Sequence, residues 1–209
     1  MTLRDRLRAA LDARDRAHDR PSFVDLRPDP SAPLAGDFAP AAVLIPFTDR
    51  PDPGLILTQR PALMSRHAGQ VAFPGGRLDP GDADAVAGAL REAREEIALA
   101  PDTVDIVGLM GRYRTGTAFE IEPVVGVIPP GLPLAPADGE VDAIFEVPLS
   151  YLLDPVNLAV KSMDWNGAER HYYEIIWKDF RIWGITAAIM VDLLTAVARA
   201  EGLTEPVRR

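Results

Sequence analysis

The sequence predicts an α/β (α+β) fold in which a mixed β-sheet has helices on both sides. Short apolar runs bounded by Pro, Gly and Asp alternate with longer segments of helical periodicity. The chain has 209 residues, of which 47% are hydrophobic and 25% charged, enough for one sizeable core. It contains no cysteine, which excludes disulfides, thiolate catalysis and Cys-based zinc sites.

The first 39 residues are expected to form an N-terminal helix and a Pro-rich arm that belong to the same unit as the domain at residues 40–200. Leu3, Leu7 and Leu11 recur at i,i+4 among charges, which predicts an amphipathic helix from Thr2 to about Arg16. We expect this helix to pack against the domain; the alternative is that it binds a partner, such as a second copy in a homodimer. The prolines between positions 21 and 40 indicate an ordered surface arm.

The next elements are mostly strands. The expected strands cover residues 41–47, 55–58, 105–113, 121–128, 141–147, 158–163 and 170–177. Turn-forming segments at 49–54 and 129–133 separate some of them. A last helix is expected over about 184–200, with one apolar face carrying Ile185, Ile189, Leu193 and Val197.

A helix with an unusual acidic side is predicted between these strands, behind the Gly75-Gly76 turn. At about 100° per residue, one stripe holds the apolar side chains of Val86, Leu90, Ala93 and Ile97. Glu92, Glu95 and Glu96 share an arc roughly opposite this stripe. Like charges at i,i+4 cost a few tenths of a kcal/mol, so an ordinary charged surface helix would separate them. Clustered carboxylates suit a hard divalent cation such as Mg²⁺.

This segment resembles the Nudix box, G-x5-E-x7-R-E-U-x-E-E-x-G-U, in which U is aliphatic. The residues that match it in register are Arg91, Glu92, Glu95, Glu96 and Leu99. Ala98 stands where the pattern has Gly, and the first half is one residue longer than the pattern. Counting forward from Gly76 puts Asp82 at the first acidic position, whereas counting back from Arg91 puts Ala83 there.

A second resemblance lies upstream and is more specific. Leu57-Thr58-Gln59-Arg60, followed by Arg66-His67-Ala68-Gly69-Gln70-Val71-Ala72-Phe73-Pro74-Gly75-Gly76, is similar to the signature of the coenzyme A pyrophosphatase branch of the Nudix hydrolases. That branch also has the longer loop, with an Asp-rich turn before the helix. Pro61 departs from the small Ser or Ala expected there. Segments 123–126, 145–149 and 182–187 are also similar, so the resemblance runs from about residue 40 to 194.

The resemblance implies a Nudix-type α/β/α sandwich with a mixed β-sheet and the Nudix loop-helix, which cleaves a diphosphate with Mg²⁺ or Mn²⁺. Glu92 and Glu96, one helical turn apart, are the first choice of metal ligands. Glu95 is either a third ligand or a base acting on metal-bound water. Arg91 is expected to pair with a carboxylate of the box and fix the helix orientation.

Substrate contacts are expected from residues on either side of the glycines. Arg60 and Arg66 can offer a guanidinium fork to phosphate, although each alone would be an ordinary surface charge. His67 either contacts phosphate or orders its loop. Gly75 and Gly76 let the backbone approach a phosphate or supply a positive φ.

Further residues are secondary candidates. Glu120, Glu122 and Glu174 are outside candidates for the general base. Nucleotide contacts are plausible for Arg112 and Arg114, beside the turn at 115–117. For Trp177 and Trp183, core packing is the default and adenine stacking the alternative.

The expected function is therefore hydrolysis of coenzyme A or its derivatives to 3′,5′-ADP and 4′-phosphopantetheine or acyl-phosphopantetheine. The alternatives are hydrolysis of another nucleoside diphosphate derivative, such as ADP-ribose or a dinucleoside polyphosphate, and a non-catalytic nucleotide-sensing module. A net charge of −9 argues against nucleic acid as a partner. No apolar run near the start or elsewhere approaches about 18 residues, so we expect a cytoplasmic protein without membrane contact.

Overall fold

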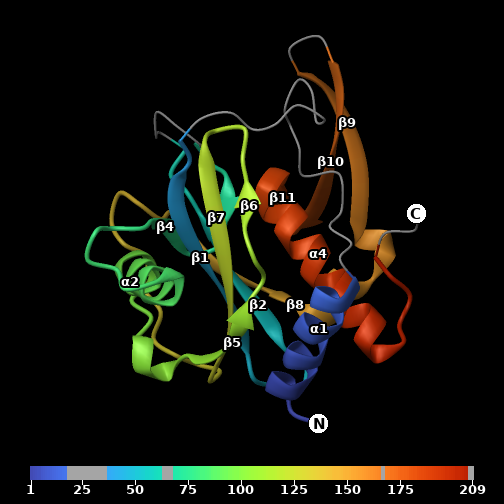
Figure 1. Cartoon of the computed structure of the whole chain (residues 1–209), viewed down its shortest axis with the longest axis horizontal. Coiled ribbons are helices and arrows are strands. Elements are labelled where there is room, and N and C mark those ends of the chain that lie inside the picture. The colour runs from blue at the N-terminus through green and yellow to red at the C-terminus, as the bar shows by residue number, and fades with distance from the viewer. Residues whose placement is uncertain (18–36, 63–67, 166–167, 207–209) are drawn as a thin grey trace.

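The computed structural model describes residues 1–17, 37–62, 68–165 and 168–206, and it contains a large mixed sheet with helices on both faces (Figure 1). The strands of this sheet are β1 (Ala39–Thr48), β2 (Gly54–Gln59), β3 (Val71–Ala72), β4 (Gly75–Arg77), β5 (Asp105–Leu109), β6 (Tyr113–Arg114), β7 (Phe119–Ile128) and β8 (Ala143–Pro148). Their main order is β3-β2-β1-β7-β5, with β4 paired to β1, β6 to β7 and β8 to β2. The β1–β7 pair is parallel and the other pairs are antiparallel, which confirms the predicted mixed sheet.

Helices cover both faces of this sheet, each over its own apolar cluster. α2 (Ala85–Ile97) packs on one face against Ala42, Leu44 and Val124. α1 (Leu3–Ala17) and α4 (Gly184–Glu201) pack together on the other face, against Ile45, Phe47 and other residues of the larger cluster. The helices predicted at the two ends of the chain are thus observed. The described chain also has α3 (Leu149–Leu153) and short 3₁₀ helices at Pro101–Thr103 and Pro155–Asn157.

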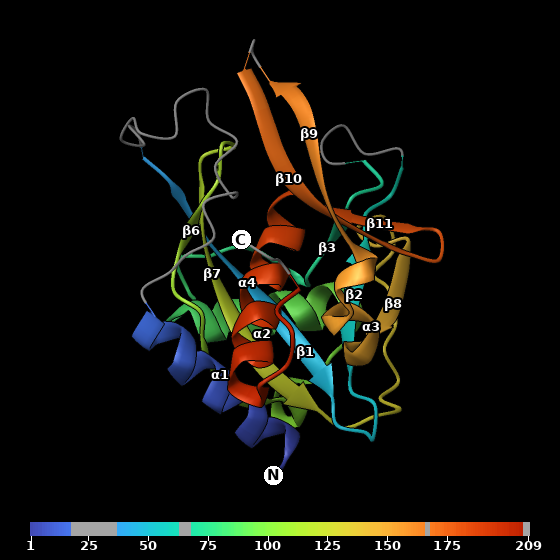
Figure 2. The same ribbon diagram turned by 90° about the vertical axis from the view of Figure 1, so that its right-hand side faces the viewer.

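A second, three-stranded antiparallel sheet stands beside α4, as Figure 2 shows, and the sequence did not separate it from the first. It contains β9 (Leu158–Trp165), β10 (Ala168–Trp177) and β11 (Phe180–Trp183). Tyr173, Ile175 and Ile182 are buried in the cluster that includes α4. Because both sheets cover α4, this helix is buried around most of its circumference.

The predicted strand at residues 105–113 was wrong in its continuity. The structure divides it into β5 and β6, with Gly111 at φ 75° between them. Only glycine adopts this backbone conformation without steric cost, and it ends the pairing of β5 with β7. β3, β4 and β11 were missed because runs of two to four residues have no readable periodicity.

Polar contacts as well as apolar ones join the N-terminal helix to α4. Arg14 donates to the Asp192 carboxylate at 2.9 Å and to the Tyr113 hydroxyl at 3.0 Å, and Tyr113 also donates to Asp192. Leu7 and Leu11 are buried nearby. Of the prolines in the predicted arm, Pro40 lies in β1, and the others lie outside the described residues.

None of the helices in the described ranges is long and apolar enough to cross a membrane.

Candidate active site

Hydrogen bonds close both ends of helix α2, although only the first end has a capping residue of the usual kind. The Asp84 side chain caps the first turn by accepting from Ala87 N at 2.8 Å. At the other end Ala98 adopts φ 55°, and its N–H donates to Arg94 O. Leu99 N then donates to Ala93 O at 3.3 Å, which completes a left-handed C-terminal cap. The Nudix pattern has Gly at position 98 because this conformation favours glycine.

The face of α2 that packs on the sheet differs from the predicted stripe. Its buried small residues are Ala85, Gly88, Ala89 and Ala93, with Ile97 completing the face. Val86 and Leu90 lie at the margin and are only partly buried. Small side chains bring the helix backbone close to β1, so the larger apolar residues misled the periodicity argument. Glu96 consequently lies within the buried face, not opposite it.

Glu92 and Glu96 point toward the glycines of β4. Gly75 N donates to Glu96 Oε2 at 3.0 Å. A side chain at Gly76 would place its Cβ 2.6 Å from Glu92 Oε1, and one at Gly75 would place its Cβ 2.4 Å from the Ala42 carbonyl oxygen. The two glycines are therefore required where the acidic side of α2 and the backbone of β1 approach β4.

Arg91 holds the neighbouring flank of the helix through a dense set of ion pairs. Its Nε and Nη2 donate to the two Asp82 oxygens at 3.1 and 2.9 Å. Its Nη1 donates to Glu92 and Glu95, each at 2.9 Å, and its Nη2 also reaches the Arg77 carbonyl at 3.1 Å. The structure thus places Asp82, the residue reached by counting from Gly76, against Arg91. The longer loop supplies this carboxylate.

The carboxylates on the two flanks of α2 differ in proton affinity. Glu96 lies on one flank, and Asp82 lies beside Arg91 on the other. Burial raises the pKa of Glu96 to about 7, and the nearby Glu92 and Glu140 carboxylates add to the effect. Burial also raises the pKa of Glu92, against the opposing contribution of Arg91. By contrast, the hydrogen bonds from Arg91 lower the pKa of Asp82. Glu96 and Glu92 thus lack part of the positive charge that would stabilise their ionised forms.

Arg60 approaches the same carboxylates from the end of β2. Its Nη1 lies 4.0 Å from Glu96 Oε1, and its buried Nε has no hydrogen-bond partner among the residues that the structure describes. The backbone is fixed because Arg60 N donates to Gln70 O at 3.0 Å. Arg66 and His67, the other predicted substrate contacts, lie outside the described residues.

One acidic residue near Glu96 had not been singled out from the sequence. Glu140 follows a turn in which Ala137 N donates to the Glu96 carbonyl at 2.9 Å, and its charge raises the pKa of Glu96. Its position at the end of Asp138-Gly139-Glu140, directly before an apolar run, was the available signal. Among the outside candidates, Glu120 is paired with Arg112 and Arg114, and Glu174 is paired with Arg181 in the second sheet.

Two carboxylates, but not three, converge at the glycines. The Glu95 side chain is 55% exposed and is held toward Arg91. Within the described ranges, no three Asp, Glu or His side chains are grouped as a metal-binding set. A pair of partly desolvated carboxylates still fits a hard cation, since Mg²⁺ typically takes one or two protein carboxylates together with substrate phosphates. Glu92 and Glu96 are the residues that would hold it.

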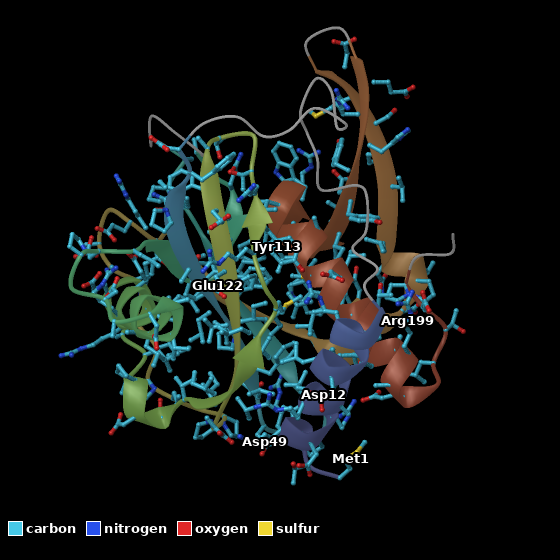
Figure 3. The ribbon with its side chains drawn as sticks, in the orientation of Figure 1. Met1, Asp12, Asp49, Tyr113, Glu122 and Arg199 are labelled. Atoms are coloured by element: carbon cyan, nitrogen blue, oxygen red, sulfur yellow. The ribbon has the colours of Figure 1, made fainter. Side chains whose placement is uncertain are left out.

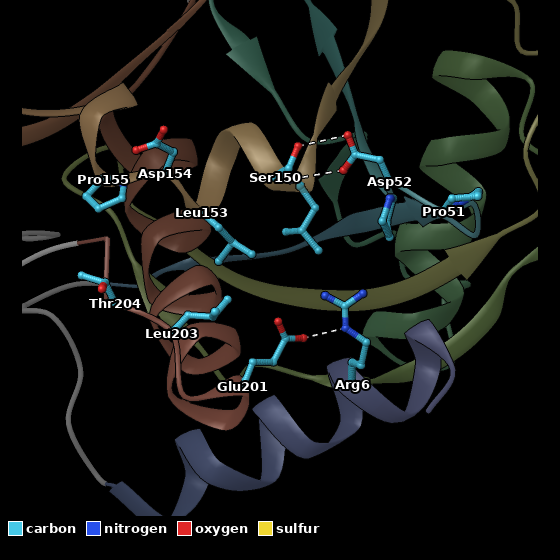
Figure 4. A pocket seen from close by; sticks show the side chains of 12 residues that line it. Arg6, Pro51, Asp52, Ser150, Leu153, Asp154, Pro155, Glu201, Leu203 and Thr204 are labelled. Atoms are coloured by element: carbon cyan, nitrogen blue, oxygen red, sulfur yellow. Dashed lines mark hydrogen bonds and ion pairs between the residues drawn. The ribbon is translucent and has the colours of Figure 1, made fainter.

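A hollow elsewhere on the molecule has a different character. It lies between the first turns of α1, helix α3 and the end of α4, away from α2 (Figure 4). Its polar lining is largely paired internally, Arg6 with Glu201 and Asp52 with Ser150. Among the residues that line it, Arg6 faces three acids, Asp52, Asp154 and Glu201, so the hollow would repel an anionic substrate.

The sequence of this chain matches a known family. The model of the NUDIX domain matches residues 38–164. The chain therefore belongs to the Nudix family. Enzymes of this family hydrolyse diphosphate bonds in small nucleotide-type molecules and generally use divalent metals such as Mg²⁺ or Mn²⁺.

Several relatives are similar over most of their length. The uncharacterized Nudix hydrolase NudL of Cronobacter sakazakii is 43% identical over 153 residues, which cover 73% of this chain and 80% of the relative. NudL of Klebsiella pneumoniae is 41% identical over 191 residues, covering 86% and 95%. Among solved structures, a C. elegans Ap4A hydrolase aligns at 18% identity and a TM-score of 0.46, covering 53% of this chain and 80% of that one. The NUDIX domain of Shewanella oneidensis NrtR, complexed with ADP ribose, aligns at 18% identity and 0.44, covering 58% and 80%.

Proposed function

We propose that this Nudix hydrolase cleaves the diphosphate of coenzyme A or its derivatives, with Mg²⁺ or Mn²⁺, to 3′,5′-ADP and 4′-phosphopantetheine or acyl-phosphopantetheine. The observation that carries the diphosphate assignment is the convergence of Glu92, Glu96 and Arg60 at the glycines of β4. The choice of coenzyme A rests on the segment from 57 to 76 and on the long loop that provides Asp82.

The residues divide the work by their environment. Glu92 and Glu96 hold the cation, which supplies charge neutralisation and activation of water when bound. Arg60 orients the diphosphate, because its guanidinium lies near Glu96 and its Nε lacks a partner within the described part of the chain. Gly75 and Gly76 keep the β4 backbone beside these carboxylates free of side chains. Arg66 and His67 remain proposed substrate contacts.

Two carboxylates near the Glu92–Glu96 pair are our first candidates to accept the proton of the attacking water, and Glu122, 3.6 Å from Arg112, stays an outside candidate. Glu95 is exposed beside Arg91, and Glu140 lies near Glu96. Their environments differ, so Glu95→Gln and Glu140→Gln should separate them in pH–rate profiles. The variant that loses the acidic limb of the profile identifies the base.

A substrate panel tests the function directly. Purified protein is incubated with Mg²⁺ and coenzyme A, ADP-ribose, NADH or diadenosine polyphosphates, and the products are resolved by chromatography. Coenzyme A should give the highest kcat/KM and the two expected fragments. If it is cleaved no faster than the other compounds, the coenzyme A assignment is wrong, and absence of any turnover favours a nucleotide sensor.

A further inference from the structure

One row of residues crosses neighbouring strands on the α2 face of the main sheet. Ala42 of β1 pairs with Gly76 of β4 on one side and with Glu122 of β7 on the other. Arg112, just before β6, continues the row, because its Nε lies 3.6 Å from Glu122 Oε2. With strands about 4.8 Å apart, the backbone of Arg112 stands roughly 14 Å from that of Gly76.

The residues in the middle of this row have a small side chain or none, and charged side chains lie at its ends. Ala42 has only a methyl group, and Gly76 has no side chain, so the Glu92 carboxylate occupies the space above that glycine. Ala42 belongs to the buried cluster under α2, which places the row on the face that carries the active-site carboxylates. Glu122 lies on the α2 side and Tyr113 on the α4 side (Figure 3).

Two exposed arginines stand at the end of the row farthest from α2. The side chains of Arg112 and Arg114 are 64% and 53% exposed. Both contact Glu120, at 3.1 and 2.9 Å, and together they lower its pKa. Two guanidinium charges thus face Glu120 and the more distant Glu122. These carboxylates are therefore neutralised, and no net negative charge at this end of the row opposes the approach of an anionic group.

Hydrogen bonds of the neighbouring residues fix the backbone of these two arginines. Tyr113 lies between them in sequence and points to the opposite face, where its hydroxyl is bonded to Arg14 and Asp192. The following turn is closed by Thr115, which accepts from Phe119 N at 3.0 Å. A flexible surface loop has no such fixation, so the position of the two arginines is set by the fold.

We propose that Arg112 and Arg114 bind an anionic group of the substrate beyond the scissile diphosphate, and that this group is a phosphate on the ribose of the nucleotide half. The proposal rests on the proposed function, which puts the diphosphate over Gly76 and Glu92. A phosphate monoester adds nearly two negative charges, which a chain of net charge −9 must offset locally. Arginine side chains extend about 6–7 Å and can offer forks to phosphate oxygens, so the spacing of the row suits one nucleotide.

The kinetic test compares coenzyme A with the same compound lacking its 3′-phosphate. In the Arg112→Gln/Arg114→Gln double variant, kcat/KM for coenzyme A should fall about 10- to 100-fold, mainly through KM, while the compound without the 3′-phosphate changes little. Arg50→Gln is the matched control: Arg50 is also exposed and ion-paired, to Glu146 at 3.0 Å, at the other end of β1. An equal loss on both substrates, or no loss, overturns the proposal.

A binding measurement separates failure of this proposal from failure of the proposed function. Calorimetric titration with 3′,5′-ADP and with 5′-AMP requires no turnover. The wild-type protein should prefer 3′,5′-ADP, the double variant should lose that preference, and Arg112→Lys/Arg114→Lys should retain part of it. Equal or absent binding of both nucleotides by the wild-type protein contradicts the proposal even where coenzyme A is cleaved. Thermal melting of each variant verifies that it is folded.

Discussion

Carboxylates lie on both flanks of α2, but they are fully ion-paired on one flank and only partly paired on the other. On one flank, Arg91 bonds Asp82 and Glu95 and reaches a backbone carbonyl. On the other, Glu96 is buried with one backbone donor, and the guanidinium of Arg60 is no closer than 4.0 Å. Glu92 faces both flanks. The saturated flank holds the helix in place, and the flank that lacks positive charge is where a bound cation would gain most. That cation would in turn offset the charge of an anionic substrate.

Replacing the buried carboxylate should have the largest effect. We expect Glu96→Gln to reduce turnover about 10²- to 10³-fold or more, because it removes one of the two carboxylates proposed to hold the cation. Arg94→Gln, at an exposed position on the same helix, is the control and should cost less than about 10-fold. Steady-state kinetics with coenzyme A and Mn²⁺ measures both, with circular dichroism to confirm folding. Equal losses in Glu96→Gln and Arg94→Gln would contradict the role given to Glu96.

Removing the centre of the saturated flank should mainly cost stability. Arg91→Leu leaves Asp82 and Glu92 without their shared partner, and both side chains are largely buried, at 7% and 18% exposure. Breaking such a cluster should lower the free energy of unfolding by about 2–4 kcal/mol. Urea titration measures this loss, and Glu95→Gln should cost less than about 1 kcal/mol. A change below that in Arg91→Leu would show that the ion pairs do not hold the helix.

The sequence showed the charges on α2 but not their division between flanks. Spacing and composition predicted the helix, the glycines and the residues of the box. The buried face was predicted in part: Ala93 and Ile97 are buried as expected, but Val86 and Leu90 are only partly buried, because periodicity weighs large apolar residues and the small Ala89 lies in the buried cluster in their place. Where a carboxylate lies relative to that contact decides whether it is desolvated. Glu140 was missed for a related reason: it meets Glu96 only through tertiary structure.

The raised pKa of Glu96 predicts a pH dependence of stability in protein freed of metal by chelation. Folding raises this pKa from 4.5 to about 7, so the folded state binds the proton more tightly than the unfolded state. Stability is therefore lost as pH rises from about 4.5 to 7, by on the order of 3 kcal/mol. Glu96→Gln removes this loss, so the variant should be more stable than wild type at pH 8.

Urea unfolding at pH 5 and pH 8 measures this difference. The advantage of Glu96→Gln should shrink toward pH 5, where Glu96 of the wild type is itself protonated. Mg²⁺ added at pH 8 should then stabilise the wild type more than the variant, because only the wild type retains the full carboxylate pair. An advantage that is the same at both pH values would refute the desolvation of Glu96.

The smallest expected effect comes from a substitution at the C-terminal end of α2. Ala98 adopts φ 55°, a conformation that strains any residue with a Cβ, and its neighbours supply the capping bonds whether or not a side chain is present. Ala98→Gly relieves the strain but loosens the unfolded chain, leaving a net gain of about 0.5–1 kcal/mol. For a domain of this size that raises Tm by about 1–4 °C, which differential scanning calorimetry resolves. Since residue 98 contacts neither flank, kcat should be unchanged. A fall in kcat would mean that the end of α2 sets the position of Glu96 two residues away, and that helix stability and active-site chemistry are coupled there.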